Sequence, residues 1–331
     1  MTANPWTRSS GRIEATPAEG TQATPRQRVR LPGSARVEID PTLLDFEYPA
    51  RSQWAQAWGR FRRHRVAIAA AFVLLLLIAA CVAAPWLAPR EVTDQDLTAT
   101  FASPNGEYWL GTDSLGRDQL SRLLYGGRVS LMVGFGVAIV AGVFGAAVGL
   151  TAGFAGRWID AVLMRLTDFW LALPALIFLI VAARIFGDSI LTVVLIVSSI
   201  TWMGLARIVR GVTLQIKEQD FVQAARATGA GPFRIVVHHI VPNALGAIIV
   251  NLTLTVAGAI LLESALSFLG LGIQPPTPTW GNMLAGSKGY VQTAPWLVWF
   301  PGLLILVTVL CVNFVGDGLR DALDPTDSRN R

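Results

Sequence analysis

Several long stretches of this chain carry no charged residue, and this feature constrains its fold more than any other. Residues 66–89 and 129–156 contain no Asp, Glu, Lys or Arg, and only 15% of the whole chain is charged. A soluble domain averages about 25% charged residues. A helix of about 20 apolar residues crosses the roughly 30 Å hydrocarbon core of a bilayer. The sequence therefore predicts an all-α membrane protein.

Six stretches are long and apolar enough to be membrane spans. The third is the weakest, because Arg165 and Asp168 lie inside it. In the second, Gly145, Gly149 and Gly153 recur every four residues, which predicts a face of small residues where another helix packs closely. The predicted spans are residues 66–89, 129–156, 160–183, 189–206, 243–262 and 294–315.

Lys and Arg are distributed unevenly between the segments that join these spans. Twenty of them lie in residues 1–65, 157, 207–241 and 317–331, whereas six lie in 89–128, 184 and 288. Cytoplasmic loops carry the excess of Lys and Arg in membrane proteins. We therefore expect both termini in the cytoplasm, residues 90–128 as an extracytoplasmic loop and 317–331 as a cytoplasmic tail. Because topology explains the positive charge, we expect membrane lipid and no nucleic acid as a partner.

The segment before the first span divides into two parts. Residues 1–45 are rich in Thr, Pro, Arg, Gly and Ala without hydrophobic periodicity, which predicts a disordered cytoplasmic tail. In residues 46–65, Trp54, Trp58 and Phe61 recur at helical spacing beside several arginines. This pattern is typical of an amphipathic juxtamembrane helix on the inner membrane face. A disordered basic segment is the alternative.

The charged residues and cysteines in or near the spans do not indicate a catalytic or metal-binding site. Arg165 and Asp168 are three residues apart, so they can pair on one helical face. Glu263 follows its span and is expected near the outer interface. A functional intramembrane site is the alternative for these charges. Cys81 and Cys311 lie in apolar runs, and the three histidines lack carboxylates at metal-ligand spacing. We expect no catalytic, metal or cofactor site, and the residues of any substrate pathway stay unassigned.

Residues 220–242 form the most structured cytoplasmic loop that the sequence predicts. Asp220 is a suitable N-cap, Gly229 a suitable helix stop and Pro232 a suitable first residue of a second helix. Ala224 and Ala225 leave a smooth surface between polar residues. Such a loop indicates a docking surface for another protein, and an ordinary inter-helix connection is the alternative.

This loop resembles the EAA loop of permease subunits in binding-protein-dependent ABC importers. That pattern has Glu-Ala-Ala, three residues, Gly, and a Pro thirteen residues after the Gly. Ala224, Ala225, Gly229 and Pro242 match it in register, and Gln223 stands in place of the Glu. A glutamine at that position still accepts hydrogen bonds.

Three further stretches resemble the dipeptide/oligopeptide/nickel permease family. They are LGTDSLGRDQLSRLLYG at 110–126, ALSFLGLG at 265–272 with Trp280-Gly-Asn, and GDGLRDALDP at 316–325. The first of these, with a basic N-terminal helix, is similar to the C-type partner of the permease pair. The resemblance covers about residues 55–326.

The resemblance implies a fold, a function and partners. It implies the type I ABC importer permease fold, with a core at 129–316 and a coupling loop at 207–242, in the bacterial inner membrane. The implied partners are a B-type permease, two cytoplasmic ATPase subunits and an extracytoplasmic substrate-binding protein. The ATPase subunits would bind ATP and Mg²⁺, because this sequence has no Gly-x-x-x-x-Gly-Lys-Ser/Thr motif. The expected cargo is a di- or oligopeptide, and nickel or another small solute is the alternative.

Two other classes of protein remain as alternatives. An ion-driven secondary transporter would carry ionisable residues or broken helices near the bilayer midplane. An intramembrane enzyme would carry a Ser–His pair, paired Asp residues or a His-Glu-x-x-His motif within its spans. The predicted spans contain no His, and Asp168 is their one Asp well clear of the ends. We therefore expect a non-catalytic subunit.

Overall fold

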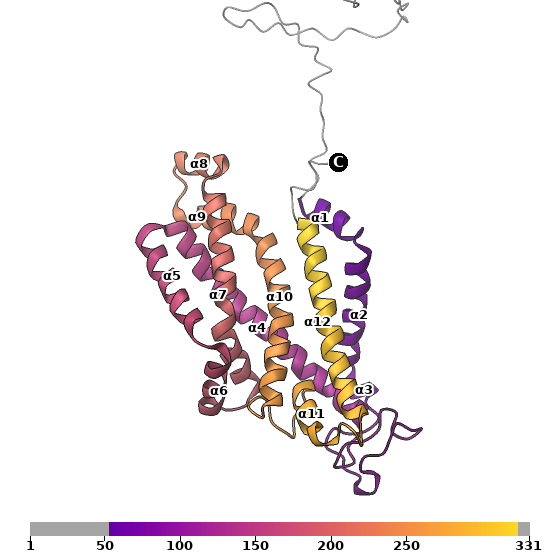
Figure 1. Ribbon diagram of the computed structural model, residues 1–331. Helices are drawn as coiled ribbons and strands as arrows, with labels where there is room; N and C mark the ends of the chain where they lie inside the picture. The colour runs from indigo at the N-terminus through magenta and orange to yellow at the C-terminus, as the bar shows by residue number, and fades with distance from the viewer. Residues whose placement is uncertain (1–52, 324–331) are drawn as a thin grey trace, which may run out of the picture. The chain divides into compact units, whose positions relative to one another are not determined.

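Long helices dominate the computed structural model, which describes residues 53–323, and no β-strand occurs within that range (Figure 1). By length and composition five helices could cross a membrane, and a sixth span exists if the bent pair α5 (Arg157–Ala172) and α6 (Ala175–Phe186) is counted as one. This arrangement confirms the all-α membrane fold. The other long helices are α2 (Arg65–Val82), α4 (Gln119–Ala155), α7 (Ile190–Lys217), α10 (Val241–Phe268) and α12 (Trp296–Leu323).

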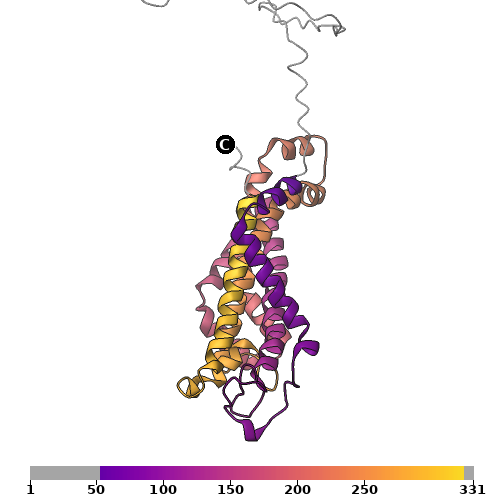
Figure 2. The ribbon, with the colours of Figure 1, turned by 90° about the vertical axis from the view of Figure 1, so that its right-hand side faces the viewer.

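Short helices gather at the two ends of this bundle. Figures 1 and 2 show α1, α8 and α9 at one end, called the α8 end below, and α3, α6 and α11 at the opposite end, called the α11 end. The short elements are α1 (Gln53–Phe61), α3 (Ala84–Leu87), the 3₁₀ turn η2 (Leu97–Ala99), α8 (Asp220–Ala227), α9 (Pro232–Ile235), the π-helical turn η3 (Val236–Ile240), α11 (Trp280–Gly286) and the 3₁₀ turn η4 (Lys288–Tyr290).

Two of the long helices extend well beyond the predicted spans. α4 begins at Gln119, although the predicted span begins at residue 129. α7 continues to Lys217, so residues 207–217 are helical and not part of a loop. At the start of α4, the Asp118 carboxylate accepts a hydrogen bond from the Ser121 backbone N–H and caps the helix. Hydropathy marks the apolar part of a helix, whereas capping decides where the helix begins.

The predicted span at 160–183 corresponds to a bent pair of helices and not to one continuous helix. It is divided into α5 and α6, which bend by 85° at a short break. Pro174 lies at this break, directly before the first residue of α6. Proline has no backbone N–H and restricts the residue before it to extended conformations. Leu173 accordingly has extended backbone angles, and the helix cannot continue through it.

Glycines on α4 bring this helix into close contact with α7. A Cβ atom added at Gly145 would lie 2.6 Å from the Trp202 carbonyl oxygen, and one added at Gly149 would lie 2.5 Å from the Ala206 carbonyl oxygen. At Gly153 it would lie 2.6 Å from the Thr213 Cβ. These distances confirm the predicted small-residue face. The two helices touch through their backbones because no side chain separates them.

The predicted pair between Arg165 and Asp168 does not form. Asp168 instead accepts a hydrogen bond of 2.6 Å from Arg207 on α7. About two turns earlier on α5, Asp160 accepts two hydrogen bonds, of 2.5 and 2.6 Å, from Arg210. Both acidic residues of α5 therefore pair with α7. The neighbouring helix supplies guanidinium groups that sequence spacing along α5 could not reveal.

Glu263 lies near the last turn of α10, and it packs inside the protein at that end of the helix. Its side chain is completely buried. Ser267 donates to it over 2.8 Å, and Ser130 on α4 donates over 3.3 Å. The Ser130 hydroxyl also accepts from the Trp280 backbone N–H at the start of α11. Glu263 therefore helps to hold three helices together, because α11 folds back over the end of α10.

The segment between α3 and α4 is an ordered loop held by side-chain hydrogen bonds. Asp96 accepts from the backbone N–H and hydroxyl of Thr98 and from the hydroxyl of Tyr108. The hydrogen bonds from Thr98, with the one from Tyr108, lower the pKa of the Asp96 carboxyl below its usual value. Arg90 lies over the Tyr108 ring, with its Cζ atom 4.5 Å from the ring centre. This loop therefore has a defined conformation at the α11 end.

The juxtamembrane segment forms a helix where it is described. α1 packs on α12, with Ala57 buried and the Phe61 ring near Gly318. A helix at 53–61 agrees with the predicted amphipathic element more than with a disordered basic segment. The predicted disordered tail at 1–45 lies outside the described residues. Cys81 and Cys311 are both buried, as expected for small apolar side chains.

Candidate functional site

The loop at 220–242 projects from the α8 end of the bundle (Figure 1). Its first helix, α8, begins one residue earlier than predicted from capping. Gln219 is the N-cap, with extended backbone angles, and Asp220 is the first helical residue. Asp220 is therefore not the cap, but its carboxylate lies in the first turn, where the helix dipole favours negative charge.

The end of α8 has the geometry that the sequence predicts. Gly229 follows the C-cap Thr228 and has a φ of +84°. The Gly229 N–H donates to the Arg226 carbonyl, and the Ala230 N–H donates to the Ala225 carbonyl. These two hydrogen bonds define a Schellman motif, which closes a helix through a left-handed residue. Gly229 is required here because only glycine adopts this φ without strain.

Apolar side chains anchor the loop to the bundle. Val222 on α8 is fully buried against Ile235 and Ile240, which follow the turn after α8. This cluster also contacts Phe154 on α4 and Ile216 on α7. The loop is therefore packed onto the ends of two long helices, and it continues directly into a third, α10.

Gln223 connects α8 to the end of α7. Its side-chain Nε2 donates to the Lys217 carbonyl over 3.1 Å. Lys217 is the last residue of α7, and carbonyls at a helix end lack partners within the helix. An ionised glutamate accepts hydrogen bonds but cannot donate one. The amide of Gln223 therefore makes a contact that the Glu of the EAA pattern could not make.

Pro242 lies on α10, just after an irregular turn. The preceding residues form the π-helical turn η3, in which the Val241 N–H donates to the Val236 carbonyl five residues back. Proline has no N–H to donate within a helix. The helix widens where Pro242 enters it, and the Asn243 side chain donates to the His239 carbonyl over 2.6 Å. The structure thus places Gln223, Ala224 and Ala225 on α8 and Gly229 directly after its C-cap. Pro242 lies on the next long helix, α10.

The outer face of the loop exposes apolar side chains. Ala224 is exposed and Ala225 is half-buried. Phe221 is 45% exposed, Phe233 is 82% exposed and Val237 is 40% exposed. Together these five residues define what we call the α8 face. The sequence analysis overlooked Phe233, although an aromatic residue directly after a helix-opening proline in a polar loop is a signal for such a surface.

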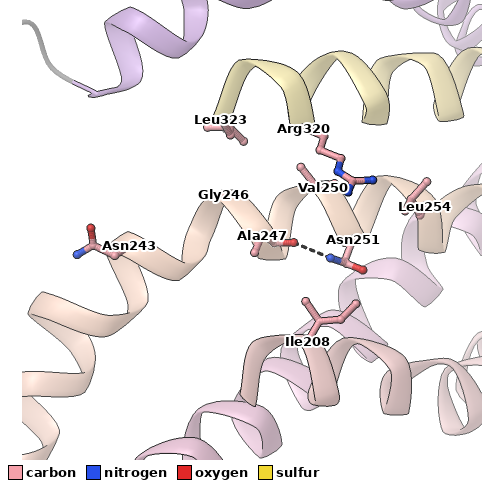
Figure 3. Close-up of a pocket in the computed structure, with 9 residues that line it drawn as sticks. All are labelled: Ile208, Asn243, Gly246, Ala247, Val250, Asn251, Leu254, Arg320 and Leu323. Atoms are coloured by element: carbon pink, nitrogen blue, oxygen red, sulfur yellow. Dashed lines mark hydrogen bonds between the residues drawn. The ribbon is translucent and has the colours of Figure 1, made fainter. Parts of the chain in front are cut away.

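A cavity of about 600 Å³ opens between α7, α10 and α12 near the base of this loop. In Figure 3, Arg320 extends from α12 toward Val250 on α10, and Asn251 points toward Ile208 on α7. The Asn251 side chain donates to the Ala247 carbonyl, which leaves its oxygen free to accept. The cavity is lined by Ile208, Asn243, Gly246, Ala247, Val250, Asn251, Leu254, Arg320 and Leu323.

The arrangement is suited to binding a protein. Within residues 53–323, no group of three or more His, Cys, Asp or Glu side chains could hold a metal ion. The α8 face combines exposed aromatic and small side chains of α8, α9 and η3, in a loop that the buried cluster around Val222 anchors. Exposed apolar patches of this kind are typical of protein–protein contacts.

Comparisons with known proteins agree on one family. Residues 132–326 match the family described as binding-protein-dependent transport system inner membrane component, and residues 52–104 match the N-terminal transmembrane domain of oligopeptide transport permease C. The chain is 40% identical to the dipeptide transport system permease protein DppC of Alkalihalophilus pseudofirmus, over 84% of this chain and 92% of that protein. It is 42% identical to the oligopeptide transport system permease protein OppC of Escherichia coli K12, over 85% of this chain and 94% of that protein.

A solved structure shows a similar fold. It is the methionine ABC transporter MetNI in an inward-facing conformation, whose matched chain has a TM-score of 0.52 and 19% sequence identity. The match covers 61% of this chain and 96% of that chain. At this level of identity the likeness concerns the fold, and it supports the permease architecture described above.

Proposed function

The chain belongs to the binding-protein-dependent transport system inner membrane components, the permease subunits of ABC importers, and from this premise we propose its cargo and its mechanism. The cargo is a di- or oligopeptide. The chain forms half of the membrane pathway, and the loop at 220–242 couples this pathway to ATP hydrolysis by separate subunits.

The peptide cargo is supported by the names of the relatives. Both permeases compared above are named for dipeptide or oligopeptide transport, and each matches this chain over more than 90% of its own length. These names favour a peptide over nickel or another small solute.

The anchoring of the α8 face is the observation that carries the coupling mechanism. Phe233 and Ala224 are exposed, whereas Val222 and Ile235 on the same loop are buried against α4 and α7. A partner that binds the exposed side therefore pushes on a helix that cannot move independently of the bundle. Displacement of α8 is transmitted to α10, because the loop continues into this helix through η3.

The same mechanism requires partner subunits that supply functions which this chain lacks. Because the sequence has no phosphate-binding loop of the Walker type, two separate ATPase subunits bind ATP and Mg²⁺. These subunits contact the α8 face of this chain and the corresponding face of the other permease. A second, B-type permease completes the pathway, and a substrate-binding protein delivers the peptide at the α11 end. In this proposal the α8 end and both termini lie in the cytoplasm of a bacterium, and the chain itself hydrolyses nothing.

The orientation can be measured with single cysteines. We expect Gln292→Cys, near the start of α12, to react with a membrane-impermeant thiol reagent in intact cells, and Thr228→Cys to react only after the cells are opened. Both side chains are exposed, whereas Ser287 nearby is buried and would not report on topology. The buried native Cys81 and Cys311 serve as the unlabelled background. If Thr228→Cys alone is labelled in intact cells, the orientation is the reverse of the one proposed.

The proposed function is tested by reconstitution in lipid vesicles. The complex of this chain with its partner permease, ATPase subunits and binding protein is expected to take up a labelled tripeptide only when ATP is present on the α8 side. The isolated chain should show ATPase activity at background level. Uptake that follows a cation gradient without ATP would instead identify a secondary transporter, and robust hydrolysis by the isolated chain would contradict a non-catalytic subunit.

A further inference from the structure

A second, smaller cavity lies at the α11 end, far along the bundle from the coupling loop. Its volume is about 90 Å³. It is enclosed by the first turn of α4, the loop directly before it, α11 and the start of α12. The residues that matter for its chemistry are Asp113, Arg117, Gln119, Arg122, Asn282 and Ser287. Four of them belong to the stretch at 110–126 that the sequence analysis singled out, which the proposed coupling mechanism does not explain.

Two residues that line this cavity each carry a buried side-chain donor without an acceptor. Arg122 is 5% exposed, and its Nη1 atom makes no hydrogen bond. Gln119 is 2% exposed, and its Nε2 atom makes none either. In residues 53–323 these are the two fully buried side-chain nitrogen or oxygen atoms without a partner. Buried polar groups in proteins are normally hydrogen-bonded, so two unpaired donors one helical turn apart on α4 point to an acceptor that enters from outside.

The acceptor does not come from the other polar residues around the cavity. The Asp113 carboxylate already accepts from the Leu115 and Arg117 backbone N–H groups and, over 2.7 Å, from the Arg117 Nε atom. Its contact with Arg122 involves Nε, at 3.5 Å, and not Nη1.

The amide of Asn282 and the hydroxyl of Ser287 are also engaged. Asn282 Nδ2 donates to the Ile273 and Thr277 carbonyls, and its oxygen accepts from the Thr279 N–H. The Ser287 hydroxyl contacts the Met283 and Leu297 carbonyls. In the structure none of these three side chains accepts from Arg122 Nη1 or Gln119 Nε2.

The charges favour an anion. Arg117 and Arg122 carry two positive charges, and Asp113, which contacts both, carries one negative charge. The charged residues that line the cavity thus sum to one positive charge, and the buried Asp118, which caps α4 through Ser121, is not among them. An arginine can only donate hydrogen bonds, and it binds planar carboxylates particularly well.

We propose that this cavity binds one carboxylate group, which accepts from Arg122 Nη1 and from Gln119 Nε2. The single charge of a carboxylate matches the net charge of the lining residues, and a cavity of about 90 Å³ admits a group of that size but no large side chain. The carboxylate belongs either to the C-terminus of an arriving peptide or to an acidic side chain of the binding protein. This choice of sources rests on the proposed function, which places the α11 end outside the cell, whereas the binding site itself does not.

The site is tested with acetate as the probe. The thermal unfolding midpoint of the assembled transporter in detergent is measured against sodium acetate and against sodium chloride at equal ionic strength. We expect acetate to raise the midpoint in a saturable manner and chloride to leave it unchanged. Gln119→Glu places a carboxylate beside Arg122, so this variant should have a higher midpoint without acetate and no response to it. The matched control Gln95→Glu, at an exposed glutamine of the same loop, should respond like the unaltered protein.

Two results would overturn the site. Equal curves for acetate and chloride would mean that the cavity holds water or nothing, and an undiminished acetate response in Gln119→Glu would place acetate elsewhere. Neither measurement depends on transport, so failure of the proposed function would be seen separately, as absence of peptide uptake by the unaltered transporter.

Uptake by the Gln119→Glu transporter then distinguishes the two sources. If the peptide supplies the carboxylate, uptake of a tripeptide with a free C-terminus should fall at least tenfold, and uptake of its C-terminal amide should not change. If the binding protein supplies it, uptake of both peptides should fall equally. Unchanged uptake of both peptides would contradict a role of the cavity in transport.

Discussion

Gly229→Arg is expected to abolish ATP-driven peptide uptake while the chain remains inserted in the membrane. Gly229 has a φ of +84°, and a Cβ atom added there would meet no atom within 4 Å. The substitution therefore costs backbone strain of about 1–2 kcal/mol and causes no clash. The long cationic side chain would extend from the α8 face beside Ala224 and keep the ATPase subunit away. Uptake and co-purification of the ATPase subunits are measured at matched membrane expression.

Gly187→Arg is the matched control for this experiment. Gly187 also follows a helix, α6, has a φ of +91° and has open space at its Cβ position, but it lies at the α11 end. It should suffer the same strain and still co-purify with the ATPase subunits. Ala224→Glu should reproduce the effect of Gly229→Arg, and it is a cleaner change than one at half-buried Ala225. If Gly229→Arg and Ala224→Glu both transport normally, the loop at 220–242 is only a connection.

Gly149→Leu is expected to destabilise the folded chain. A Cβ atom at Gly149 would lie 2.5 Å from the Ala206 carbonyl oxygen and 2.8 Å from the Val209 Cβ atom. The first of these contacts is with backbone, so no rotation of a side chain can relieve it, and α4 and α7 must move apart. Overpacking of this kind costs about 1–3 kcal/mol and occasionally more. We expect a markedly lower thermal midpoint and an aggregated fraction on size-exclusion chromatography.

The control for this variant is Gly204→Leu on α7. Nothing lies within 4 Å of a Cβ atom at Gly204, although this residue is on the helix that α4 contacts. Replacing a glycine within a helix gains about 0.5–1 kcal/mol from backbone entropy. Gly204→Leu should therefore be as stable as the unaltered chain or slightly more stable. Equal losses in both variants would show that general sensitivity of α4 and α7, and not their close contact, explains the result.

The helical fold and the structure of the loop at 220–242 could be predicted because their signals are local in the chain. Hydropathy located the apolar parts of α2, α4, α7, α10 and α12, since crossing a bilayer requires consecutive apolar residues. The Schellman motif at Gly229 could likewise be predicted, because a helix stop depends on the few residues around it. The match of Ala224, Ala225, Gly229 and Pro242 to a family pattern is also a property of the sequence alone.

Features that depend on contacts between distant residues were decided by the tertiary structure. Asp168 pairs with Arg207 and not with its neighbour Arg165, because α7 brings a guanidinium within 2.6 Å. Glu263 is buried because α11 folds back against α10. The unpaired donors of Gln119 and Arg122 became apparent only when every surrounding acceptor could be counted. Local spacing thus determined the helices and their ends, whereas the partners of buried charges depend on side chains that meet in space after distant segments pack together.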